Sequence, residues 1–204
     1  MALAPRIDGM RVLAYDITDD AFEKLIAFVT IRKEWLRVGQ FERIVILCST
    51  DVMSDAVALN LQGQNIPCVL FTVRLCKDDE KAVTPLWKSF QQGEFVVAVM
   101  NSSVFEYAGL GIPKNIIFFD PSNADRFADL IKTFRTLRLR REDLMTVDVL
   151  VTIHKTPELL ELVAREIGNT RGNPPQWLEN AIQQTAHLRA VVEQPHEPRT
   201  IYEL

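Results

Sequence analysis

Five basic residues near the end of one predicted helix form the densest positive cluster in the sequence: Lys132, Arg135, Arg138, Arg140 and Arg141. Lysine and arginine bind phosphate groups by charge and hydrogen bonding, so these side chains are candidates for contacting RNA or an acidic partner. Basic residues in the last turn of a helix also stabilise the helix dipole while pointing into solvent. We favour the second interpretation, a solvated helix end.

Two aromatic residues, Phe105 and Tyr107, lie in the polar segment 101–107, which reads Asn-Ser-Ser-Val-Phe-Glu-Tyr. Aromatic side chains are enriched among the residues that dominate protein–protein binding energies, so both are candidates for a protein interface. The alternative is that the two rings fold back onto the core of the domain. These two interpretations remain open.

A third candidate site is the segment Ser49, Thr50 and Asp51, which directly follows an apolar run and precedes a predicted helix. Loops at the carboxyl ends of parallel strands are common ligand sites. The same residue types are typical of a helix N-cap, and we favour that interpretation.

Metal and redox chemistry are not indicated. The cysteines Cys48, Cys68 and Cys76 share no ligand spacing with the three histidines, so we expect no metal. Cys48 and Cys68 lie in or beside apolar runs, which favours buried free thiols. We also expect no bound cofactor.

Composition indicates a globular domain, because 48% of the 204 residues are hydrophobic and 25% are charged. A net charge of −4 is unfavourable for a protein that binds phosphate mainly by charge. Residues 1–8 carry a proline and charges where a signal peptide would be apolar, and no apolar run is long enough to span a bilayer. We therefore expect no membrane association and a cytoplasmic or nuclear location.

Strand-like and helix-like segments alternate along the chain. Strands are predicted at 10–15, 43–47, 68–73, 95–100, 116–119 and 144–153, and helices at 19–38, 49–63, 80–92, 122–140, 156–167 and 176–192. This alternation predicts one α/β domain with a mostly parallel sheet of about six strands and helices on both faces. The break at 168–175 divides the chain into a domain at 1–168, a helical extension at 169–192 and a tail at 193–204.

Several segments, taken in order, resemble the C-terminal RecA-like domain of DEAD-box and related superfamily-2 RNA helicases. They are RIVILCSTDVMSDAVALNLQGQNIPCVLFT (43–72), WKSFQQGEFVVAV (87–99), GLGIP (109–113), FFDPSNADRF (118–127) and NPPQWLENA (173–181). No single segment is specific, but their order and spacing together are. The resemblance implies a RecA-like fold.

The resemblance fails where that family places its catalytic groups. The positions that correspond to the arginines of its motif VI hold Leu130 and Thr133, and the threonine and aspartate of its motif V are absent. The chain also has no Gly-x-x-x-x-Gly-Lys-Ser/Thr phosphate loop and no Asp-Glu-Ala-Asp run. Since a supplied arginine accelerates phosphoryl transfer by roughly 10³–10⁵, we expect no ATPase activity and no catalytic residues.

A retained fold without catalytic groups predicts a module that associates with proteins, including copies of itself. It is similar to the helicase-C-like domain near the N-terminus of Yb-type Tudor-domain proteins of the piRNA pathway. That similarity implies self-association within an RNA-processing granule of the cytoplasm. The alternative is the RNA-binding C-terminal half of an ATP-dependent DEAD-box RNA helicase, which the missing arginines disfavour.

Overall fold

The computed structural model describes residues 10–37, 43–78, 80–107, 113–138, 145–170 and 172–192. The elements in chain order are β1 (Met10–Asp16), α1 (Ala21–Arg37), β2 (Ile44–Cys48), α2 (Asp51–Gly63), β3 (Cys68–Phe71), α3 (Val73–Asp78), α4 (Glu80–Gln92), β4 (Val97–Asn101), α5 (Val104–Tyr107), β5 (Asn115–Phe119), α6 (Ala124–Arg138), β6 (Met145–Val151), α7 (Pro157–Asn169) and α8 (Gln176–Val192).

The strands form one sheet in the order β1-β6-β5-β2-β4-β3, and every described pair is parallel. Every residue of β2, β4 and β5 is buried, as expected for β-branched and apolar runs covered on both faces. The prediction of an α/β domain with a parallel sheet is confirmed. Because all strands run the same way, their carboxyl ends meet at one edge of the sheet.

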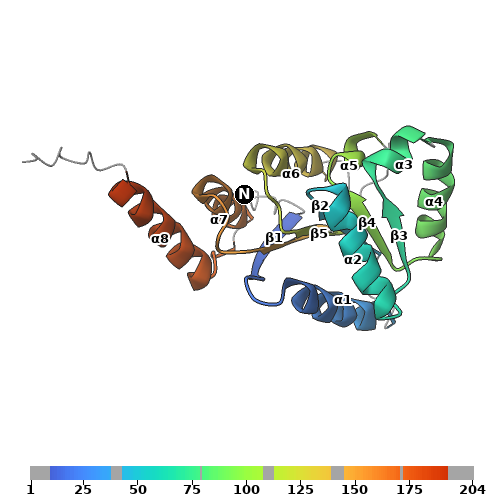
Figure 1. The fold of residues 1–204 in the computed structure, drawn as a ribbon, viewed down its shortest axis with the longest axis horizontal. Coiled ribbons are helices and arrows are strands. Elements are labelled where there is room, and N and C mark those ends of the chain that lie inside the picture. The colour runs from blue at the N-terminus through green and yellow to red at the C-terminus, as the bar shows by residue number, and fades with distance from the viewer. Residues whose placement is uncertain are drawn as a thin grey trace, which may run out of the picture.

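Helices cover both faces of the sheet, as predicted (Figure 1). Alternate residues of each strand point to opposite sides, so Ile44 and Ile46 join the core under α1 and α2, whereas Val45 and Leu47 join the other core. That second core includes residues of α4, α5, α6, α7 and α8. On this face the rings of Phe118 and Phe127 lie edge to face, with centroids 4.8 Å apart.

Helix ends follow the local sequence signals. Thr50 is the N-cap of α2, and its hydroxyl accepts a hydrogen bond from the Met53 N–H at 3.1 Å. The cap interpretation of this segment is therefore confirmed. Gly93 ends α4 with φ of +94°, a conformation that glycine adopts without steric cost. Thr156 precedes α7 without a side-chain cap bond, and Pro157 begins that helix.

Two short helices were not predicted. The strand expected over 68–73 ends at Phe71, because the Thr72 hydroxyl accepts from the Leu75 N–H at 3.1 Å and begins α3. Helix α5 lies within the segment 101–107, which was expected to be a loop.

Helix α8 occupies the predicted range and packs on α7, with Leu178 and Ala181 buried in the shared core. Figure 1 shows α8 extending away from the sheet beside α7. The predicted tail at 193–204 lies outside the described residues. Among the helices in the described ranges, none combines the length and apolar composition that a membrane span requires.

Candidate functional site at the carboxyl edge of the sheet

The loops that follow β2, β4 and β5 meet at the carboxyl edge of the sheet and line a cavity of about 320 Å³ together with α6. β2 lies between β4 and β5, so these three loops are neighbours. The lining combines serine hydroxyls with apolar side chains and one guanidinium group; it consists of Leu47, Cys48, Ser49, Ser102, Ser103, Phe118, Pro121, Ser122, Asn123, Arg126, Phe127 and Leu130. A cavity at this position of a parallel sheet is where such folds bind ligands.

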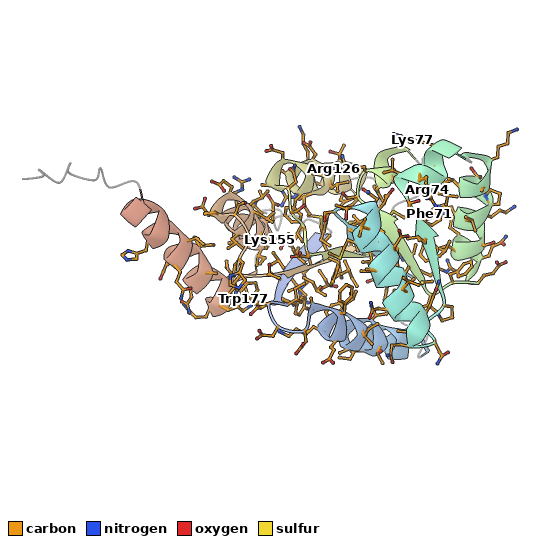
Figure 2. All side chains as sticks on the ribbon, in the orientation of Figure 1. Phe71, Arg74, Lys77, Arg126, Lys155 and Trp177 are labelled. Atoms are coloured by element: carbon orange, nitrogen blue, oxygen red, sulfur yellow. The ribbon has the colours of Figure 1, made fainter. Side chains whose placement is uncertain are left out.

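Arg126 supplies the one cationic side chain among these lining residues. Its Nη2 donates a 2.6 Å hydrogen bond to the carbonyl oxygen of Ser102, which is buried in the loop after β4. Its backbone N–H is capped by the Asn123 side chain at 2.9 Å, which fixes the start of α6. Figure 2 labels Arg126 at the end of α6 that lies near α5. The guanidinium therefore braces the loop after β4.

Asp51 holds the same loop from the other side. Its Oδ1 accepts hydrogen bonds from Asn101 Nδ2 at 2.8 Å and from the Val73 N–H at 3.0 Å. Asn101 in turn accepts from the Ser103 N–H at 2.9 Å. One carboxylate oxygen thus connects the start of α2, the start of α3 and the end of β4.

The far end of the same edge is also tied by polar contacts. Lys155 Nζ donates to Asp120 Oδ2 at 2.8 Å, joining the ends of β5 and β6. Thr18 donates to Asp16 at 2.6 Å and accepts from the Ile153 N–H at 3.1 Å, joining the ends of β1 and β6. The side chains of Asp16, Asp120 and Lys155 are therefore engaged in contacts within the domain.

Cys48 lines the cavity but offers neither a nucleophile nor a metal ligand. Burial raises the pKa of its thiol to about 12, although a hydrogen bond with Ser54 acts in the opposite direction. The thiol is therefore protonated near neutral pH. Cys48, Cys68 and Cys76 are all free, as predicted. Within the described residues, no group of three or more potential ligand side chains is placed to hold a metal ion.

The predicted basic cluster is only partly within the described residues. Lys132 is exposed on α6, and the Arg135 guanidinium forms an ion pair with Glu166 of α7, whose side chain is 7% exposed. The side chain of Arg138 and all of Arg140 and Arg141 lie outside the described residues. The contact to Glu166 packs α6 against α7. Phosphate binding by this cluster stays a prediction.

The predicted aromatic pair is also divided. Phe105 is buried and contacts Phe134 edge to face, with ring centroids 5.1 Å apart. The position of Phe105 fits the second interpretation, in which its ring packs on the core of the domain. The side chain of Tyr107 lies outside the described residues, so its role at an interface stays a prediction.

Sequence reasoning missed Arg126. Leu130, for which the sequence resemblance predicts a motif VI position, is buried at the cavity. Arg126 lies one helical turn before Leu130 and lines the same cavity. The i, i+4 spacing of Arg126 and Leu130 was the available sequence signal that both lie on one side of α6. It indicates a site only when the loop containing Ser102 is known to lie opposite them.

Comparison with known proteins finds likeness in structure only. No protein-family model matches the chain, and no curated protein sequence does. The C-terminal domain of the DEAD-box protein Dbp5 superposes with a TM-score of 0.60 at 15% identity, covering 88% of this chain and 99% of that one. E. coli SrmB, a DEAD-box protein bound to the regulator RraA, superposes with a TM-score of 0.54 at 18% identity. The match covers 84% of this chain and 89% of that one.

A third solved structure, the Hef helicase domain of Pyrococcus furiosus, gives a TM-score of 0.51 at 19% identity. The match covers 66% of this chain and 26% of that chain, so this chain spans about a quarter of the Hef helicase domain. The fold is therefore that of the C-terminal RecA-like domain of DEAD-box helicases. The expectation from the sequence segments is confirmed at the level of fold.

Replacing Arg126 with alanine tests the brace across the cavity. The substitution leaves the buried Ser102 carbonyl without its charged donor, so the free energy of unfolding should fall by about 1–3 kcal/mol in urea denaturation. Asp129→Ala, at an exposed position further along α6, is the control and should change the free energy by less than about 0.5 kcal/mol. Equal stability of the Arg126→Ala and Asp129→Ala proteins would contradict a bracing role.

Proposed function

We propose that this chain is a helicase-C-like module that does not hydrolyse ATP and that associates with other proteins, including copies of itself. The observation that carries the first part is the composition of the cavity at the carboxyl edge. One arginine lines it, that arginine is bonded to the Ser102 carbonyl, and buried Leu130 lies one turn further along α6.

Phosphoryl transfer requires positive charge placed against the transferred phosphate. An arginine placed against the transferred phosphate is worth roughly 10³–10⁵ in rate, or about 4–7 kcal/mol of activation free energy. Leu130 and Thr133 provide no charge at the corresponding positions. Lys155, a second cation at this edge, is paired with Asp120. These contacts support a domain that keeps the fold without the catalytic step.

Association with proteins is supported by a structural neighbour and by charge. SrmB has this fold and is bound to the protein RraA. A net charge of −4 is a poor basis for affinity that depends on phosphate neutralisation. The similarity to Yb-type proteins adds self-association and a place in an RNA-processing granule of the piRNA pathway to the proposal.

Sedimentation equilibrium over a concentration series tests self-association. The weight-average mass should rise from that of the monomer, 23.3 kDa, toward that of a dimer as the concentration increases. The increase should persist at high salt if apolar contacts dominate the interface. A mass that stays at the monomer value up to about 1 mM protein would remove self-association from the proposal. A dimer with a Kd of about 1 mM has a binding free energy of only roughly 4 kcal/mol.

Titration with single-stranded RNA at two salt concentrations tests the alternative of an RNA-binding helicase half. We expect weak binding that changes little when Lys132, Arg138, Arg140 and Arg141 are replaced by glutamate, because the net charge opposes phosphate binding. Exposed Lys88→Glu on α4 is a charge-reversal control. Micromolar affinity with a steep salt dependence, lost in the quadruple variant and kept in Lys88→Glu, would favour the RNA-binding function instead.

A further inference from the structure

Helix α2 is unusual among the described helices in what it exposes to solvent. Val52 is 78% exposed and Leu59 is 67% exposed. Exposed positions of α4, α6 and α7 within the described residues hold polar side chains, proline or glycine. The remaining large exposed hydrophobic residue in the described ranges is Ile31 of α1, which covers the same face of the sheet.

Val52 and Leu59 are on one side of α2 together with Ala56, at positions i, i+4 and i+7. We call these three residues the α2 stripe; it runs about 10 Å along the helix. The opposite side of α2 is already committed to the core through Val57 and Leu61. The helix is thus apolar on two opposite sides, whereas packing within the domain accounts for only one of them.

Charge beside the stripe indicates the kind of partner. Helix α2 contains two carboxylates, Asp51 and Asp55, and no lysine or arginine. Asp51 is engaged with Asn101 and Val73, whereas Asp55 is exposed and neighbours Val52 and Leu59 at i−3 and i+4 spacing. A basic side chain that reached across the stripe would find this carboxylate at its edge.

A second copy of this chain is a poor occupant of the α2 stripe. Antiparallel two-fold packing about Ala56 would bring the Asp55 carboxylates of both copies to the same side of the contact, where they repel. Two large side chains and an alanine also offer far less area than the roughly 800 Å² per partner of a stable dimer. A single helix is sufficient to cover a stripe of this length.

We propose that the α2 stripe docks a short basic amphipathic helix of a partner protein. Its apolar residues would cover Val52, Ala56 and Leu59, and a lysine or arginine beside them would pair with Asp55. This inference rests on the proposed function, because it names a surface and a partner class for the protein association. In helix-on-helix contacts of this type, apolar anchor residues recur at i, i+3, i+4 and i+7 along each helix.

The test uses a fluorescent helical peptide of about 14 residues, roughly four turns, with leucines along one side and lysines flanking them. A matched peptide carries glutamate in place of each lysine. The lysine peptide should bind the full chain with micromolar affinity that weakens as salt is added, and the glutamate peptide should bind at least tenfold more weakly. Equal binding of the two peptides, or no binding of the lysine peptide, would overturn the proposal.

The protein variant is Val52→Gln with Leu59→Gln, since glutamine is a good helix former and both positions are exposed. It should keep the unfolding midpoint of the parent chain and weaken peptide binding at least tenfold. Thr84→Ala with Gln91→Ala on α4, an exposed pair at the same spacing, should change binding less than twofold. Asp55→Asn should weaken binding and reduce its salt dependence.

Sedimentation of the same proteins separates this inference from the proposed function. Self-association that persists in the Val52→Gln, Leu59→Gln protein is the expected result, because a second copy is not the occupant. Loss of self-association in that variant would show that the stripe binds another copy, which overturns the inference but leaves protein association standing. Peptide binding that is unaffected by the double substitution would overturn the inference as well.

Discussion

The loop that follows β4 is held between one carboxylate and one guanidinium group, and the carboxyl edge of the sheet depends on this clamp. Asp51 bonds the Asn101 side chain from the start of α2, and Arg126 bonds the Ser102 carbonyl from the start of α6. Both are hydrogen bonds of a charged group, which are stronger than bonds between neutral groups. Because β4 neighbours both β2 and β3, the clamp fixes the relative positions of the loops that line the cavity.

The same contacts define what the edge has available for chemistry. The cavity offers serine hydroxyls and one arginine, and that arginine is oriented by a backbone carbonyl. Lys155 and Asp120 neutralise each other further along the edge. Transfer of a phosphoryl group is promoted by several positive charges converging on one point. We therefore propose that the fold is retained here for its surfaces, of which the exposed side of α2 is the most unusual.

Most of the fold could be predicted from the sequence because its determinants are local. The run 44–47 is apolar at every position, as expected of a strand covered on both faces. Thr50 and Gly93 are residue types that favour helix ends. The short helix α3 was missed although Thr72 caps it locally; its start is also held by Asp51, distant in sequence, which accepts from the Val73 N–H.

The candidate site was harder to predict, because its contacts join segments far apart in the chain. The sequence resemblance drew attention to Leu130 and Thr133 but not to Arg126, whose partner Ser102 is known only from the folded structure. The ion pair between Arg135 and Glu166 also joins segments that are far apart in the chain. A basic residue on a predicted helix does not indicate that a buried carboxylate of another helix will face it. Exposure of Val52 and Leu59 likewise required the placement of α2.

The most direct test of the central claim is RNA-stimulated ATP hydrolysis by a chimera that joins the first RecA-like domain of an active DEAD-box helicase to this chain. The reference is the same first domain joined to its own second domain, under identical conditions. The account predicts a rate at least about 10³-fold below the reference, as expected when the arginine contribution is missing. A rate within tenfold of the reference, reduced further by Arg126→Ala, would contradict it.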